Sequence, residues 1–301
     1  MRKPFTVILA LLMGVTSMNA LVKNGSCGAN LTWTLNTLDS TLVISGSGAM
    51  SYGTYNQYPG WQNYKSYIAY ITLPHGLTSI AEEAFSYCSN VTKLIIPDNV
   101  VTIGDNAIRY CGIDSLVIPD KVRNIGYGAF KDCSDLVSVK IGAKVKSIRG
   151  SAFANCTSLP SVEIPEGVTS IRTSAFEGCT GLKSVIIPNS VDTIDLGAFY
   201  CCGLTTVINY SATPQPLDGR AFMYVNKSAC TLYVPANSIN AYSVATEWED
   251  FFRILSIDEI PTAIEQVSEE TESSIHKLLK DGKVLIERDG KVYTLQGSVL
   301  K

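Results

Sequence analysis

A sequence unit of 22 or 23 residues recurs along the middle of this 301-residue chain. Its anchor is the pattern Ile-x-x-x-Ala-Phe-x-x-Cys, which begins at Ile80, Ile125, Ile148, Ile171 and Ile194. A further copy begins at Ile103, with Ile108 in the phenylalanine position, and a degenerate copy begins at Leu217. Because a unit this short cannot bury an apolar face alone, the units must stack into one continuous core.

A second element, Leu/Val-x-Ile-Pro, lies between the anchors, for example at Leu94 to Pro97 and Val185 to Pro188. Hydrophobic residues two apart have the period of a strand, and proline ends a strand because it has no N–H to donate. The anchor residues instead project onto one face of a short helical segment. We therefore predict an α/β-type repeat solenoid, a leucine-rich repeat fold with a parallel sheet on one side and short helical segments on the other.

The anchor followed by Leu-x-x-Val-x-Ile-Pro resembles the BspA-like branch of leucine-rich repeats, found in bacterial cell-surface and secreted proteins. The resemblance extends to Cys27–Leu35 and Ser45–Met50, which are similar to the N-terminal cap of such proteins, and to a closing segment from Thr231 to Ile254. It implies a non-enzymatic adhesion protein, and host extracellular-matrix proteins such as fibronectin or fibrinogen are among the partners of some members.

The N-terminal residues predict export. Arg2 and Lys3 precede an apolar run from Phe5 to Val15, and small residues follow to Ala20, which is the pattern of a secretory signal peptide. The run is shorter than the about 20 residues that a membrane-spanning helix needs. A lipid anchor on Cys27 is the alternative, although Asn24-Gly25-Ser26 lacks the aliphatic residue of a lipoprotein signal. We expect an extracellular or cell-surface location and no membrane span.

The chain divides into six parts by pattern and composition. They are a signal peptide at 1–20, an aromatic-rich β cap at 21–67, repeats at 68–235, a C-terminal cap at 236–258, a linker at 259–277 and a β-hairpin at 278–301. In the hairpin, alternating strands at Lys283–Arg288 and Lys291–Leu295 flank an Asp289-Gly290 turn. This hairpin is either an accessory element or, by resemblance, a sorting tail for surface attachment.

Aromatic residues crowd both predicted caps. The first cap contains Trp33, Trp61 and a series of tyrosines that includes Tyr55 and Tyr58. Its aromatic rings either pack over the first repeat or form a platform that binds glycans. The second cap is predicted to be an amphipathic helix from Ile239 to Phe252, with Tyr242, Trp248, Phe251 and Phe252 turned inward.

Six of the nine cysteines occupy the same position in successive units: Cys88, Cys111, Cys133, Cys156, Cys179 and Cys202. Parallel side-chain vectors suit a disulfide poorly, so we expect a ladder of buried thiols. The pairing of Cys27, Cys201 and Cys230 stays open. The two histidines, His75 and His276, are far apart in the chain, and no metal-ligand spacing or nucleophile motif occurs. We therefore expect no catalytic residues, no metal and no cofactor.

The remaining candidate is the outer face of the predicted sheet. With 46% hydrophobic residues and a net charge of −3, the chain forms a core but offers no overall basic character for nucleic acid. We predict that a protein ligand binds the exposed residues between the buried strand positions, Lys93, Ile95, Asp114, Val117, Lys140, Glu163, Lys183 and Ile186. Thr206 and Ile208 are expected on the same face. The alternatives are an assembly component of a bacterial surface complex and a glycan-binding module in the cap, and the oligomeric state is open.

Overall fold

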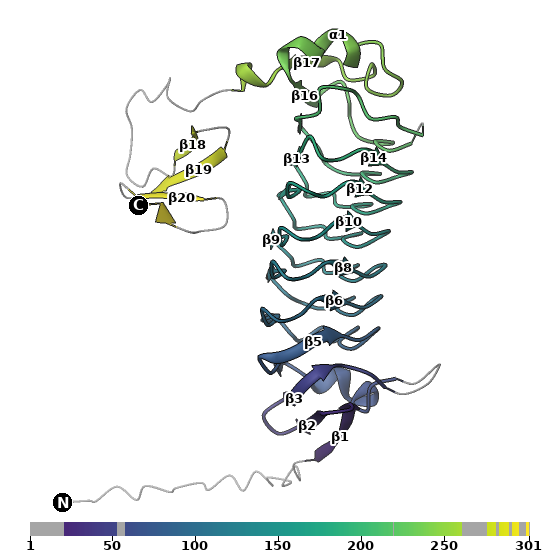
Figure 1. Ribbon diagram of the computed structural model, residues 1–301, viewed down its shortest axis with the longest axis vertical. Helices are drawn as coiled ribbons and strands as arrows, with labels where there is room; N and C mark the ends of the chain where they lie inside the picture. Colours follow the sequence, from purple (N-terminus) through teal and green to yellow (C-terminus); the bar gives the residue numbers. More distant parts are fainter. Residues whose placement is uncertain are drawn as a thin grey trace, which may run out of the picture.

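The computed structural model describes residues 21–52, 58–218 and 220–260, and the backbone of four strands between 276 and 300. The predicted signal peptide, most of the predicted linker and Tyr55 lie outside the described residues. The repeats stack into an elongated solenoid, with one turn of the solenoid for each sequence unit (Figure 1). The predicted repeat solenoid is therefore confirmed. Within the described part of the chain, no helix is long and apolar enough to cross a lipid bilayer.

The Leu/Val-x-Ile-Pro elements form parallel strands on one side of the solenoid, as predicted. These strands are β7 (Ser115–Val117), β9 (Ser138–Lys140), β11 (Ser161–Glu163), β13 (Ser184–Ile187), β15 (Thr206–Asn209), β16 (Thr231–Val234) and β17 (Arg253–Ser256). β7 pairs with β9, and a continuous five-stranded sheet is formed by β11, β13, β15, β16 and β17. Val162, Val185 and Val207 stand in register and are buried, so identical repeat positions build one layer of the core.

A second series of short parallel strands, which the sequence analysis did not predict, leads into the anchors. It comprises β5 (Gly76–Ile80), β6 (Thr102–Ile103), β8 (Asn124–Ile125), β10 (Ser147–Ile148), β12 (Ser170–Ile171) and β14 (Thr193–Ile194). β5, β6 and β8 pair in sequence order, and so do β10, β12 and β14. Each strand ends on the anchor isoleucine, which points into the core and is at most 2% exposed.

The Ala-Phe segments are consecutive tight turns, so the prediction of short helical segments is wrong in this detail. In the unit that begins at Ile80, Glu83 and Tyr87 have positive φ angles of 52° and 63°, which a right-handed helix excludes. The N–H groups of Glu83, Phe85 and Tyr87 donate to carbonyls of the next unit, on Asp105, Ala107 and Arg109, at 2.7–2.9 Å. A helix would bond these groups within its own chain segment. The turns instead bond laterally and hold neighbouring units together.

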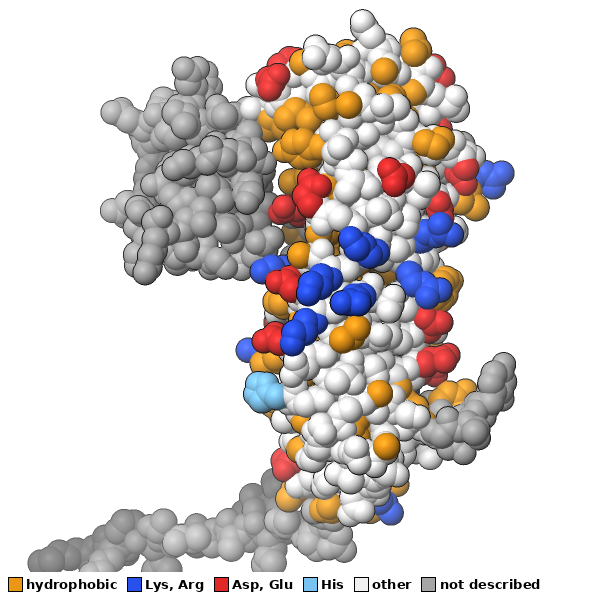
Figure 2. Space-filling view, viewed as in Figure 1, with side chains coloured by type: hydrophobic (Ala, Val, Ile, Leu, Met, Phe, Trp, Pro, Cys, Tyr) orange, Lys and Arg blue, Asp and Glu red, His pale blue; other side chains and the backbone are white. Residues whose placement is uncertain are grey.

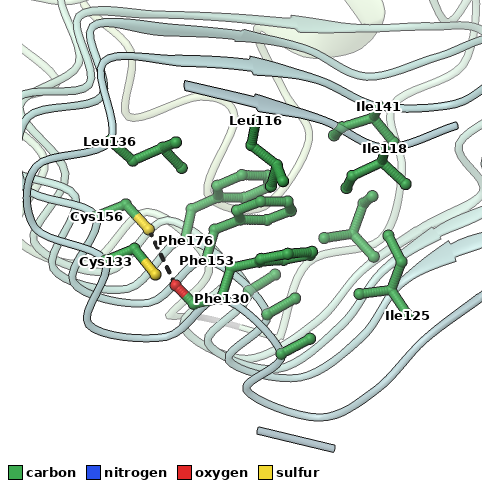
Figure 3. Packing of buried hydrophobic residues seen from close by; sticks show 14 of the residues in the cluster. Leu116, Ile118, Ile125, Phe130, Cys133, Leu136, Ile141, Phe153, Cys156 and Phe176 are labelled. Carbon is green, nitrogen blue, oxygen red and sulfur yellow. Dashed lines mark hydrogen bonds between the residues drawn. The ribbon is translucent and has the colours of Figure 1, made fainter. Parts of the chain in front are cut away.

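The phenylalanines of the anchors stack in a row through the centre of the solenoid (Figure 3). Phe130, Phe153, Phe176, Phe199 and Phe222 follow one another with ring centroids 5.1–5.5 Å apart, and all are fully buried. Trp61 stacks on Phe85 at the N-terminal end, at 6.1 Å. Trp248 lies 5.3 Å from Phe222 at the other end. Ile108 takes the phenylalanine position between Phe85 and Phe130, so Trp248 closes the row at Phe222, whereas Trp61 packs on the first anchor ring, Phe85.

The cysteines of the anchors form the predicted ladder of buried thiols. Each thiol from the second unit onward donates to a carbonyl of the preceding unit, as Cys111 does to Phe85 at 3.1 Å and Cys156 to Phe130 at 3.4 Å (Figure 3). Burial raises the pKa of the Cys133 thiol to about 12. All nine cysteines are free in the structure, including Cys27, Cys201 and Cys230.

The N-terminal cap is an antiparallel sheet of β1 (Val22–Gly28), β2 (Leu31–Asn36) and β3 (Thr41–Ala49), followed by the 3-10 helix η1 (Gln62–Tyr67). β3 pairs in parallel with β4 (Tyr70–Thr72) and with β5. The cap therefore continues directly into the second strand series and covers the edge that the first repeat would otherwise expose.

The C-terminal cap differs from the predicted amphipathic helix. It contains the 3-10 helix η2 (Ala236–Ser238), the single helical turn α1 (Ile239–Tyr242) and, after β17, the 3-10 helix η3 (Ile257–Glu259). Glu247 has a positive φ of 67°, which a continuous helix cannot contain. Tyr242, Trp248 and Phe251 are buried as predicted, but Phe252 is 80% exposed. The inward position predicted for Phe252 is therefore wrong.

Beyond residue 275, four antiparallel strands follow in the order β18 (His276–Lys280), β19 (Lys283–Arg288), β20 (Lys291–Thr294) and β21 (Val299–Leu300). The predicted hairpin corresponds to β19 and β20, in which Arg288 pairs with Lys291. The Asp289-Gly290 turn between them lies outside the described residues. β18 begins inside the range that the sequence analysis assigned to the linker, so the sheet is larger than a hairpin.

We predict that Phe153→Ala lowers the free energy of unfolding by about 3–5 kcal/mol, because it removes an internal ring of the stacked row and leaves a cavity. Phe252→Ala is the matched control. Its ring is exposed, so the same substitution should change the free energy by at most about 0.5 kcal/mol. Urea denaturation monitored by circular dichroism measures both values. Equal losses in the two variants would contradict the stacked row as a source of stability.

The buried thiols also predict a pH dependence. The folded state raises the pKa of Cys133 to about 12, above the value of an unfolded thiol. The resulting stabilisation is complete below about pH 8.5 and is lost as the pH rises through the folded pKa. Urea denaturation at about pH 8 and about pH 10.5 should therefore show a falling free energy of unfolding. Cys133→Ala should fall less steeply than the parent chain, and parallel pH profiles would refute the assignment.

Candidate binding face

Five of the eight predicted binding residues hold equivalent repeat positions and line up across the outer surface of the Leu/Val-x-Ile-Pro side of the solenoid, with Lys140 of β9 and Glu163 of β11 one 23-residue unit apart. Val117 pairs with Lys140 across β7 and β9, and Glu163 pairs with Ile186 across β11 and β13. Ile95 joins the same line, because Lys93 bridges Ser115 two residues earlier in each unit. We call Ile95, Val117, Lys140, Glu163 and Ile186 the outer column.

The outer column combines aliphatic and charged side chains. Ile95 is 71% exposed and Val117 is 58% exposed, while Lys140 and Glu163 are exposed and Ile186 is half-buried. The residues on either side of the column positions point inward and are buried, as Leu116 and Ile118 are around Val117, except that Val139 beside Lys140 is half-buried. The backbone under the column is therefore fixed by the core, and its side chains project from a rigid surface.

The other three predicted residues lie beside the column rather than in it. Lys93 occupies the neighbouring column, which continues with Ser115, Ser138, Ser161 and Ser184. Asp114 and Lys183 each precede their strand by one residue, and both are exposed. The Asp114 carboxylate accepts a hydrogen bond from Ser115 Oγ at 2.7 Å. These three residues flank the outer column on one side.

The line of side chains extends further than predicted. Ile186 pairs with Ile208, Ile208 pairs with Tyr233 and Tyr233 pairs with Leu255. Tyr233 and Leu255 are half-buried, and the Leu232-x-Val234 alternation around Tyr233 is a sequence signal that could have placed it there. Ile208 is only 6% exposed, so the expectation that it is an exposed surface residue is wrong.

The aromatic residues of the N-terminal cap serve mainly the core. Trp61 is fully buried, and its indole N–H donates to the Ala84 carbonyl at 2.8 Å. Trp33 and Tyr52 contact its edge, with ring centroids 5.6 and 5.8 Å away. Burial raises the pKa of Tyr52 well above its usual range. Of the two alternatives for this cap, packing over the first repeat therefore holds for Trp61, and the glycan platform does not, because its ring has no free face.

Tyr58 differs from the other aromatic residues around Trp61, because it is 60% exposed. It borders an open hollow of about 460 Å³ that Ser26, Gly28, Ala29 and Tyr52 also line. The described residues contain no cluster of three or more His, Cys, Asp or Glu side chains that could hold a metal ion. The hollow beside Tyr58 is therefore a concave surface in addition to the exposed sheet face.

The fold and the face together define a leucine-rich repeat solenoid with a rigid sheet surface, an architecture suited to binding proteins. The family described as the BspA type leucine-rich repeat region matches residues 62–179, 102–229 and 146–260, with six copies. The chain belongs to this family. No curated protein matches it.

The solved structure of a Bacteroides ovatus protein shares this fold. A leucine-rich repeat protein from Bacteroides ovatus is 19% identical, with a TM-score of 0.54, and the match covers 75% of this chain and 66% of that one. The chain thus spans just under two thirds of that relative. A leucine-rich cell surface protein from Faecalibacterium prausnitzii is 18% identical over 63% of this chain and 94% of that chain, with a TM-score of 0.28. The pneumococcal vaccine antigen PcpA is 13% identical over 79% and 98%, with a TM-score of 0.30.

Proposed function

We propose that this chain is exported and acts at the bacterial cell surface as a non-enzymatic protein that binds a protein ligand through the outer column. The observation that carries the proposal is the exposure of Ile95 and Val117, at 71% and 58%, in line with the charged Lys140 and Glu163. Aliphatic side chains that a partner can bury, next to charges that orient it, are what protein interfaces use.

The rigidity of the sheet supports this proposal. Binding costs conformational entropy when loops must be ordered, and a face fixed by its own core avoids most of that cost. The residues next to each outer-column side chain are packed in or against the core, so the direction of the side chain is set before a ligand arrives. The spacing of about 4.8 Å between strands then presents the side chains as a regular row.

Export and surface location rest on the sequence of residues 1–20 and on the family. The basic residues Arg2 and Lys3 and the apolar run that follows them support secretion. The Faecalibacterium prausnitzii relative is described as a cell surface protein. The resemblance to BspA-like proteins makes host extracellular-matrix proteins, fibronectin and fibrinogen among them, the first partners to test.

We predict that Val117→Asp weakens binding to a matrix protein by at least about 10-fold, because it places an unpaired carboxylate where the partner buries an aliphatic group. The measurement passes purified residues 21–301 over immobilised matrix proteins at physiological salt. Lys140→Glu should weaken the same interaction by reversing an orienting charge.

Val244→Asp is the matched control, because Val244 is 75% exposed in the C-terminal cap, away from the outer column. It should bind like the parent chain, and all three variants should keep the parent thermal midpoint. A matrix protein that binds the parent and the Val117→Asp variant equally would contradict the outer column as the site. Absence of binding across the matrix proteins would favour a role in assembling a surface complex.

The C-terminal strands give a separate prediction on localisation. We propose that residues 278–301 act as a sorting tail for surface attachment, as their resemblance to such tails implies. Deleting them should move the protein from the cell-surface fraction to the periplasmic or medium fraction, measured by cell fractionation and surface labelling. The stacked phenylalanines and the lateral hydrogen bonds of the described repeats lie outside 278–301, so the deletion variant should keep the parent thermal midpoint of the repeats while its circular dichroism loses the contribution of β18 to β21. Unchanged surface display would refute the sorting role.

A further inference from the structure

Basic side chains gather on a second face of the solenoid, over the short strands β8 and β10 (Figure 2). The repeat places them at three positions, which are four and two residues before the anchor isoleucine and one residue after it. We call this group the basic patch, and all of its members are exposed: Lys121, Arg123, Lys144, Lys146, Arg149 and Arg172.

Stacking brings these residues together although they come from three sequence units. Lys121 and Lys144 occupy the same repeat position in neighbouring units, as do Arg123 and Lys146. Lateral hydrogen bonds fix the offset between those units, for example from Gly128 N–H to the Gly150 carbonyl at 2.9 Å. With about 4.8 Å between adjacent strands, equivalent side chains stand one strand spacing apart.

The charge of this region is opposite to that of the whole chain. Residues 121–149 contain seven Lys or Arg and two Asp, a net charge of +5, whereas the full chain carries −3. Of the two acidic residues, Asp132 pairs with Arg109 at 3.2 Å. In the patch, Arg172 pairs with Asp195 at 3.1 Å. Among the described residues, no ion pair involves the other five side chains of the basic patch, so their charges are available to a ligand.

The surroundings of the patch narrow the chemistry of that ligand. Between the basic positions lie Asn124, Ser147 and Ser170, whose amide and hydroxyl groups can bond to other hydroxyls. Ser170 Oγ already donates to Ser147 Oγ at 2.7 Å, so these side chains are close together. The patch positions hold only basic and small polar side chains, and at their edge Tyr127, which is 49% exposed, lies against Gly150. Single-stranded nucleic acids are bound by several aromatic side chains on which successive bases stack, and protein partners by buried apolar or aromatic anchors, so one tyrosine at the edge favours neither.

We propose that the basic patch binds an acidic polysaccharide, whose carboxylate or sulfate groups meet the Lys and Arg side chains and whose hydroxyls meet Asn124 and the serines. This site is separate from the outer column, because it lies over the short strands that lead into the anchors, whereas the outer column lies over β7, β9, β11 and β13. It would give the chain two ligands on one scaffold. The interaction is electrostatic and solvent-exposed, so salt weakens it.

The experiment measures binding of purified residues 21–301 to immobilised heparin, which carries sulfates, and to polygalacturonate, which carries only carboxylates. Neutral dextran and single-stranded DNA are the comparison surfaces. The parent should bind at least one of the two acidic polysaccharides and should not bind dextran. Its affinity for the acidic polysaccharide should fall at least about 10-fold as the salt concentration rises from about 50 to 500 mM. Lys144→Glu with Lys146→Glu should weaken that binding at least about 10-fold.

Lys93→Glu with Lys183→Glu is the matched control, because it makes the same change in net charge beside the outer column. It should leave polysaccharide binding within about two-fold of the parent. Lys144→Gln with Lys146→Gln, an uncharged pair of substitutions, keeps the test valid if charge reversal disturbs folding.

Binding to heparin alone identifies sulfate as the recognised group, and binding to polygalacturonate alone identifies carboxylate; both results support the proposal. Three results overturn it: no binding to either acidic polysaccharide, equal losses in the patch and control variants, or tighter patch-dependent binding of DNA. Binding of matrix proteins by the outer column is measured in a separate experiment. The proposed function and the polysaccharide site can therefore be refuted independently of each other.

Discussion

Lateral hydrogen bonding between successive turns is the constraint on which the rest of this structure depends. Every second N–H group of a turn segment donates to the next unit, as Phe130 does to Ala152 and Phe153 does to Ala175. An inserted or deleted residue in one unit would shift these partners and leave buried groups without a bond, which costs about 1–3 kcal/mol each. The repeat length stays at 22 or 23 residues because a constant length keeps these hydrogen-bond partners aligned. The stacked phenylalanines and the thiol ladder follow from it, because identical positions can meet only where the register is kept.

The core residues were predictable because the same hydrophobic residue type recurs at each buried position in several repeat units. The anchor Ile, Ala, Phe and Cys and the strand Val and Ile are buried in unit after unit, as their recurrence indicated. The turn geometry was not predictable in the same way. Residues at offsets 0, 4, 5 and 8 share one face of a helix, but they also share one side of two successive tight turns. What separates the two arrangements is a pair of left-handed residues per unit, such as Ser151 and Asn155, and many residue types can occupy those positions.

The candidate sites show a second limit of sequence reasoning. Strand alternation correctly placed Ile95, Val117 and Lys140 on the outer surface, since alternation depends only on the local chain. It failed for Ile208, whose exposure depends on what surrounds it rather than on its position in the strand. The basic patch was missed for a related reason. A net charge of −3 averages over the chain, whereas Lys121 and Lys144 become neighbours only through stacking. Charge has to be counted at equivalent repeat positions before such a patch is visible.

The solenoid separates stability from recognition more completely than a globular fold does. Its inward positions are constrained at every turn by the same isoleucine, phenylalanine and cysteine, so they leave little freedom for function. Its outward positions face solvent and make few contacts with one another, so they can change at a cost that is usually within about 0.5 kcal/mol. Two different surfaces, one with exposed aliphatic side chains and one with clustered cations, can therefore share a single core. Because each surface extends over several units, its affinity can be altered one unit at a time while the lateral bonds that define the fold stay intact.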